Sequence, residues 1–346
     1  MNGGRSRVEV PTRLLVHSLV REDGTVDAGE LYAVAGILGM TDQQVRLCVK
    51  RLVAEGRFDH EGRGRKAVLR ATADATGSLA PDADFVRHAY RQDRGRAPWD
   101  GVWHLFAFAV PEARRAARDA LRDSLLRLGA APVQGGFYAS ANPIEPYVEA
   151  EARTLDVLPA VTFLTSTDLR IGTVGRPADL AASLWPLAEI TERYDRLADL
   201  AESCLTEIDR GAERQGEEPI GAAWGGEGMV ARGGGGASVR GGGEPLPDAE
   251  RLTMAVELAA EFTRAMEPDP LLPPELLPHP WPGRRARELT AACWGRLLEP
   301  RTGRGDSAQL PRLFRLYGDV LEQDGPDPEG VGIGGRDAAG RIQVDQ

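Results

Sequence analysis

The residues best suited to chemistry lie between positions 41 and 54, where polar and basic side chains recur at helical spacing. Thr41 is a favourable N-cap, and Gln44 three residues later completes a capping box. One stripe of the predicted helix is apolar: Val45, Cys48, Val49 and Leu52. The opposite stripe is mostly polar and basic: Gln43, Arg46, Leu47, Lys50 and Ala54, with Arg51 beside it. Gln, Arg and Lys bind adenine and guanine edges in the major groove, and an apolar side chain contacts the thymine methyl, so the predicted chemistry is base recognition.

A second basic group follows this helix in a predicted hairpin. Gly56 ends the helix, a short strand is expected over 58–60, and a second strand over 66–71. The turn between them reads Gly-Arg-Gly-Arg, and its arginines suit phosphates or a narrow minor groove. The candidate DNA-binding residues are therefore Thr41, Gln43, Arg46, Leu47, Lys50, Arg51, Arg63, Arg65 and Lys66.

The distribution of charge supports binding over the simpler alternative. Most amphipathic helices followed by a hairpin bind nothing, and a basic helix face is usually only solvated. Here, residues 46–70 hold eight Lys or Arg against three acids, a net charge of +5, whereas the whole chain carries −10. Positive potential is thus concentrated where contact with a duplex requires it, in a protein whose remaining surface repels nucleic acid.

Other kinds of site lack the necessary residues. The five histidines are scattered, and no Cys or His pair has metal-ligand spacing, so no metal and no cofactor is predicted. Cys48, Cys204 and Cys293 indicate buried thiols in a reducing cytoplasm. No apolar run approaches the ~18 residues of a membrane span, and no secretory signal is recognisable, so we expect a cytoplasmic protein without membrane contact. The glycines at 330–335 lack the βαβ unit that a dinucleotide fingerprint needs.

The elements before the basic helix fit a small DNA-binding module. A first helix is expected over 12–20, a short strand at Val26, and a second helix from the Asp27 cap to Leu38, ended by Gly39. Helix, helix, capped helix and hairpin form the order of a winged helix-turn-helix. We therefore predict such a domain over 10–71.

The rest of the chain predicts two further domains, giving an α+β protein. After a linker at 72–98 with a helix over 82–92, the segment 99–170 has the order βαββαβ of a ferredoxin-like unit. A mainly helical C-terminal domain is expected over 176–209 and 248–300. Its first part should be one long helix from 178 to 210, kinked at Pro186. Between these parts, 210–247 is read as a Gly-rich disordered insertion, and 301–346 as a variable tail with one helix over 310–323.

With these segments in order, the chain resembles PaaX-type regulators, the bacterial repressors of phenylacetate catabolism and related genes. Three stretches carry the resemblance. They are QVRLCVKRLVAEGRF with its GRGR turn, WDGVWHLFAF with RDALRDSLLRLGAAPVQGGFYAS, and LWPLAEITERYDRL with EPDPLLPPELLPHPWPGRRARELT. The last is the most specific.

The resemblance implies a homodimeric repressor that binds a palindromic DNA operator and is released by an aryl-CoA thioester, typically phenylacetyl-CoA. Carried over by motif, its operator-reading positions coincide with the basic face derived above. Two departures stand out. Ala67 and Val68 occupy positions where the family usually has aromatics after the wing turn, and the segments 210–248 and beyond 300 are extra.

An effector site needs an apolar lining with a few polar anchors. The candidate lining consists of Trp99, Trp103, Phe137, Tyr138, Trp185 and Tyr194, and the candidate anchors for CoA phosphates are Arg114, Arg115, Arg118 and Arg122. Aromatics at such spacing are more often core, and helix-surface arginines are usually only solvated. Two alternatives stay open: a regulator without a small ligand, and a metal-dependent nuclease on the ferredoxin-like domain. The nuclease would need an acid at the end of its first strand, where this sequence has none.

Overall fold

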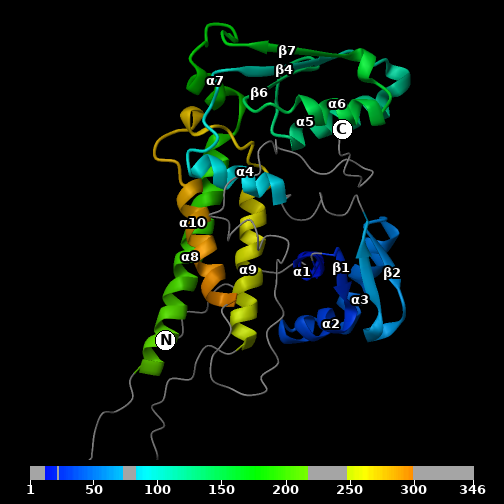
Figure 1. Ribbon diagram of the computed structural model, residues 1–346, viewed down its shortest axis with the longest axis vertical. Coiled ribbons are helices and arrows are strands. Elements are labelled where there is room, and N and C mark those ends of the chain that lie inside the picture. Colours follow the sequence, from blue (N-terminus) through cyan, green and yellow to red (C-terminus); the bar gives the residue numbers. More distant parts are fainter. Residues whose placement is uncertain (1–11, 22, 73–82, 217–247, 299–346) are drawn as a thin grey trace, which may run out of the picture.

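The computed structural model describes residues 12–21, 23–72, 83–216 and 248–298. Three groups of elements follow one another along the chain, and Figure 1 shows them in turn in blue, in cyan to green, and in green to orange. The predicted tail helix over 310–323 and most of the glycine-rich segment lie outside the described residues.

The first group combines three helices with a small antiparallel sheet. Its elements are α1 (Thr12–Ser18), β1 (Thr25–Asp27), α2 (Ala28–Ile37), α3 (Asp42–Ala54), β2 (Phe58–Glu61), the 3-10 turn η1 (Gly64–Lys66) and β3 (Val68–Ala71). The strands lie in the order β1-β3-β2. The predicted strand near Val26 and the hairpin are confirmed. The second hairpin strand begins two residues later than predicted because the turn continues as η1 through Lys66.

Local capping explains where the helices of this group begin. The Asp27 carboxylate accepts from the Glu30 N–H at 2.9 Å, as expected for the start of α2. At α3, Thr41 Oγ1 accepts from the Gln44 N–H at 3.2 Å, and Gln44 Oε1 accepts from the Thr41 N–H at 2.8 Å. The predicted capping box is therefore confirmed. Gly56 follows the helix at a φ of +68°, a conformation that glycine adopts at little cost.

The helix α4 (Ala83–Asp93) leads into the second group. That group consists of β4 (Trp103–Phe108), η3 (Glu112–Arg114), α5 (Arg115–Arg127), β5 (Ala131–Gln134), β6 (Phe137–Ser140), α6 (Glu145–Thr154), η4 (Leu158–Ala160) and β7 (Val161–Ser166). All strand pairs are antiparallel and lie in the order β5-β6-β4-β7. This is the predicted βαββαβ arrangement, in which the first and third strands are central.

The sheet of the second group is apolar on both faces. Phe106 packs with α5 and α6, which cover one face (Figure 1). Trp103 and Leu105 instead belong to the large core that includes the C-terminal helices. Successive side chains of β4 point to opposite faces of the sheet. One face therefore packs on α5 and α6, and the other packs on the large core that includes the C-terminal helices.

The third group is helical: α7 (Pro177–Leu184), α8 (Leu187–Gly216), α9 (Asp248–Met266), η5 (Pro274–Leu276) and α10 (Gly283–Leu298). The prediction of one kinked helix over 178–210 is wrong. The chain leaves the helix at Trp185, which has an extended backbone (φ −116°, ψ 146°), because the residue before a proline disfavours the α conformation. The second helix continues to Gly216, beyond the predicted start of the insertion at 210.

Two negative findings complete the fold. In the ranges that the structure describes, no helix combines the length and apolarity needed to cross a bilayer. Nor do the His, Cys, Asp and Glu side chains of those ranges form a group of three or more arranged to hold a metal ion.

Candidate nucleic-acid interface

Helix α3 packs its apolar stripe against the core, with Val45 and Leu52 buried and Cys48 and Val49 half-buried, and leaves its polar stripe in solvent. Val45 and Leu52 are 0% and 1% exposed, because they face the core shared with α1 and α2. Every predicted contact residue on this helix is exposed: Thr41, Gln43, Arg46, Leu47, Lys50 and Arg51. Leu47 is 49% exposed, so its side chain is accessible to a partner.

The exposed stripe of α3 divides into two sides. Asp42, Arg46 and Val49 line a cleft of about 360 Å³ between α3 and the hairpin turn. The rest of its lining consists of Ala28, Leu31, Tyr32, His60, Gly64, Arg65 and Leu69. Gln43, Leu47 and Lys50 are not part of that lining. The sequence predicted a single polar face of this helix. In the structure, Arg46 lies on a side that lines the cleft, and we call the side with Gln43, Leu47 and Lys50 the outward side.

The turn at η1 is folded back toward α2 and α3. The Ala28 N–H donates to the Ala67 carbonyl at 3.0 Å. A Cβ atom on Gly29 would lie 2.9 Å from the Arg65 carbonyl oxygen, so the glycine permits this close approach. The Arg65 guanidinium carbon lies 6.0 Å from the ring centroid of Tyr32, and its Nη2 lies 3.7 Å from Asp42 Oδ2. Arg65 is thereby held beside α3.

The positive charge of the region is only partly neutralised within the protein. Two of its three acids meet arginines: Glu55 lies 2.7 Å from Arg13, and Glu61 lies 3.5 Å from Arg70. The turn cations Arg63, Arg65 and Lys66 are all exposed. An exposed cationic surface flanked by paired acids can hold a polyanion.

Sequence reasoning missed the residues that hold the turn in place. Gly29, Tyr32 and Asp42 carried no expected role, and neither did His60 in the cleft. Their role depends on contacts between α2 and η1, about thirty residues apart in sequence, and no local pattern encodes such a contact. Only the place of Asp42 in the first turn of α3, directly after the Thr41 cap, was predictable.

The predicted effector aromatics do not form one wall. Trp103 stacks on Trp185 (6.3 Å between centroids) and meets Trp99 edge-on (5.4 Å). Trp103 and Trp185 are buried in the core, and Trp185 Nε1 donates to the Gly129 carbonyl at 3.0 Å. Phe137 lies on β6, half-buried against the large core, whereas Tyr138, the next residue, stacks on Phe108 in the core beneath α5 and α6. Packing of protein on protein accounts for each of these rings.

The predicted phosphate anchors already have partners. Arg114 donates to the carbonyls of Leu155 and Asp156, while Arg118 and Arg115 bind Glu112, and Arg122 binds Asp123. The hydrogen bond from Arg118 to Glu112 also raises the pKa of that arginine. These surface pairs lie on η3 and α5, whereas the stacked tryptophans lie on the other face of the sheet.

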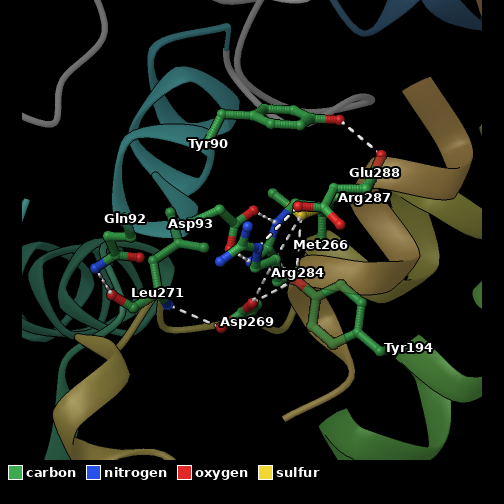
Figure 2. Close-up of polar contacts among 10 residues, drawn as sticks. All are labelled: Tyr90, Gln92, Asp93, Tyr194, Met266, Asp269, Leu271, Arg284, Arg287 and Glu288. Atoms are coloured by element: carbon green, nitrogen blue, oxygen red, sulfur yellow. Dashed lines mark hydrogen bonds and ion pairs between the residues drawn. The ribbon is translucent and has the colours of Figure 1, made fainter. Parts of the chain in front are cut away.

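Tyr194 belongs to a separate, buried polar cluster (Figure 2). Arg287 of α10 donates twice to Asp93 of α4, at 2.6 and 2.7 Å, and once to Tyr194 Oη at 2.7 Å. The Tyr194 hydroxyl donates to Asp269, whose second oxygen accepts from the Leu271 N–H at 2.9 Å. Burial raises the pKa values of Asp269 and Tyr194, and the nearby Arg287 charge opposes both shifts. The cluster contains no activated nucleophile, and it ties α4 to the C-terminal helices.

Comparison with known proteins identifies two segments. The description "PaaX protein central Cas2-like domain" matches residues 96–179, and "PaaX-like protein C-terminal domain" matches residues 239–302. Among solved structures, the chain is similar to "Uncharacterized protein Rv0674 from Mycobacterium tuberculosis". Identity is 20%, the TM-score is 0.41, and the likeness covers 78% of this chain and 89% of that chain. A search of curated proteins found no match. The central match coincides with the antiparallel sheet of the second group and the other match with α9 and α10, so these two parts of the chain are those of PaaX-type proteins.

Proposed function

We propose that this protein is a PaaX-type transcriptional regulator that binds a specific DNA duplex through its N-terminal elements. In this proposal, residues 12–72 form a winged helix-turn-helix, α3 enters the major groove, and the η1 turn is the wing. The observation that supports it best is the outward side of α3, where Gln43, Leu47 and Lys50 are exposed while Val45 and Leu52 anchor the helix in the core.

Each of these side chains suits a different feature of a base pair. The Lys50 ammonium can donate to guanine O6 and N7, the Gln43 amide can pair with adenine N6 and N7, and Leu47 can contact the thymine methyl. Recognition by three side chains fits the few base pairs that one helix reads. The surrounding arginines would supply the salt-dependent affinity for phosphates.

We further propose that the protein acts as a homodimer on a palindromic operator. The two matches to PaaX-type domains support a regulatory role rather than an enzymatic one. With two-fold symmetry, two copies of α3 would meet half-sites about one helical turn, or ~10 bp, apart. The structure describes one chain, so the spacing of the half-sites is an independent test of the dimer.

We further propose that an aryl-CoA thioester releases the protein from DNA. The alternative is a regulator that binds DNA without any small ligand. The stack of Trp103 on Trp185 favours the ligand-independent regulator, because both rings are buried and offer an effector no free surface. The arginines of α5 are exposed, but they already pair with acids of this chain. Titration calorimetry with phenylacetyl-CoA separates the two. Binding heat with a reciprocal loss of DNA affinity supports an effector, and its absence supports the ligand-independent regulator.

The DNA-binding proposal is tested by selection from a random duplex pool with the full-length chain. We expect enrichment of one two-fold symmetric sequence. Lys50→Ala should weaken binding to that sequence by about 1–3 kcal/mol without changing the circular dichroism spectrum. Arg153→Ala on α6, another exposed cation, is the matched control and should bind as wild type does. A pool without enrichment, or a Lys50→Ala protein with wild-type affinity, would reject the proposal.

A further inference from the structure

The cleft between α3 and η1 carries a cation on each wall. Arg46 projects from α3 and Arg65 from the turn, and both line the same space of about 360 Å³. Among the described residues, Arg46 has no ion-pair partner, and Arg65 has one distant partner, Asp42 at 3.7 Å. The three charges sum to +1, which matches the single negative charge of one phosphodiester group.

We propose that this cleft holds one backbone phosphate of the bound duplex, with Arg46 and Arg65 as its two donors. The inference rests on the proposed DNA-binding function and assigns a specific ligand to the cleft. If α3 lies in the major groove and the turn lies at the adjacent minor groove, one strand of the sugar–phosphate backbone must run between them. Guanidinium groups present forked donors that match phosphate oxygens, and they remain charged at any physiological pH.

Two neighbouring side chains orient the Arg65 guanidinium group for this contact with phosphate. The Tyr32 ring lies beneath its guanidinium group, and the Asp42 carboxylate lies at its edge. Gly29 allows the turn to approach α2 closely enough for both contacts. Tyr32 and Asp42 are therefore positioning residues, since they orient Arg65 and need not contact DNA themselves.

This assignment separates Arg46 from the base-reading residues with which the sequence grouped it. Asp42, Arg46 and Val49 follow one another at spacings of four and three residues, so they share the side of α3 that faces the turn. A phosphate contact carries no sequence information, whereas contacts by Gln43 or Lys50 do. Arg46 should therefore contribute to affinity and not to sequence preference.

The test compares Arg46→Ala, Arg65→Ala and Lys50→Ala full-length proteins on the selected duplex and on its single-base variants, over a series of salt concentrations. Either arginine variant should lose about 10-fold or more in affinity, by the same factor on every duplex. The slope of log affinity against log salt should also decrease by about one. Lys50→Ala should instead change the ranking of the single-base variants.

Two further measurements locate the phosphate and the role of Tyr32. Neutral methylphosphonate is placed at one linkage at a time, and one position should weaken binding by the wild type more than binding by Arg46→Ala or Arg65→Ala, because each variant keeps only one of the two donors. Tyr32→Phe keeps the ring and should behave as wild type, whereas Tyr32→Ala should lose part of the Arg65 contribution to the salt slope.

The possible outcomes separate failure of the phosphate assignment from failure of the DNA-binding proposal on which it rests. If the wild-type chain binds no duplex specifically, both fail. If it binds specifically but Arg46→Ala alters base preference and leaves the salt slope unchanged, the cleft does not hold a phosphate. If no methylphosphonate position distinguishes wild type from the arginine variants, the cleft assignment fails and base recognition by α3 stands.

Discussion

Replacement of Arg287 by methionine should unfold the C-terminal helices at a markedly lower denaturant concentration. The Arg287 side chain is 4% exposed, and its partners Asp93 and Asp269 are 10% and 4% exposed. Loss of the cation leaves Asp93 and the Tyr194 hydroxyl without their donor and Asp269 without its nearby positive charge. Breaking a buried ion pair from one side costs about 3–5 kcal/mol. Two charge-assisted hydrogen bonds at about 1.5–3 kcal/mol each give a similar figure.

The assay is urea unfolding followed by tryptophan fluorescence. Trp281 contacts Tyr194 edge-on at 5.9 Å, so it reports on this cluster. The control is Arg284→Met, which removes an exposed arginine one turn away that pairs with Glu288 at 2.8 Å, and it should leave the midpoint unchanged. A double variant, Asp93→Leu with Arg287→Met, should recover much of the loss, because an apolar pair can replace a buried ion pair at little cost. If Arg287→Met unfolds at the same midpoint as Arg284→Met, the cluster does not hold α4 on the body.

Three further predictions concern stability. Burial, followed by the charges of Arg13 and Arg57, lowers the pKa of His17 from 6.5 to about 4. The unfolded chain therefore binds more protons between these values, so stability is complete above pH 6.5 and falls by up to ~3 kcal/mol as the pH drops to 4. His17→Leu should flatten this part of a pH series of unfolding curves. Gly129→Ala forces a φ of +83° on alanine and places its Cβ 2.7 Å from the Pro270 carbonyl oxygen, and thermal unfolding should show a loss of at least about 2 kcal/mol. Gly56→Ala, at +68° but in open space, should cost clearly less, and an equal cost would contradict the tight contact at Pro270. Thr41→Ala removes the cap of α3 and should cost about 1 kcal/mol in the same assay, whereas Thr41→Ser should not.

The elements that depend on local signals were predictable. The cap of α3, its end at Gly56 and the short strand at Val26 were read from nearby residues, and the structure has them at those positions. The antiparallel sheet followed from the order of its segments. The failure at Pro186 is also local: a proline was expected to kink the helix, but the residue before it prefers an extended backbone, and α7 ends there.

The contacts that depend on the tertiary fold were not predictable. Arg287 and Asp93 are 194 residues apart in sequence, and nothing in either segment indicates the pair. The aromatic residues proposed for an effector illustrate the same difficulty, because spacing alone does not distinguish a ring that lines a pocket from one that fills a core. Likewise, helical periodicity placed Arg46 with Lys50, and only the folded turn shows that Arg46 lines the cleft and Lys50 does not.

The central claim is that α3 contacts DNA, and tethered cleavage tests it most directly. In a Cys48→Ala background, where the remaining Cys204 and Cys293 are buried, the exposed thiols of Leu47→Cys and Leu164→Cys are each labelled with iron–EDTA, and each protein is bound to the selected duplex. The two native side chains are similarly exposed, 49% on α3 and 48% on the central sheet. We predict strand cleavage within each half-site from position 47 and none from position 164. Cleavage from position 164 alone would contradict the account.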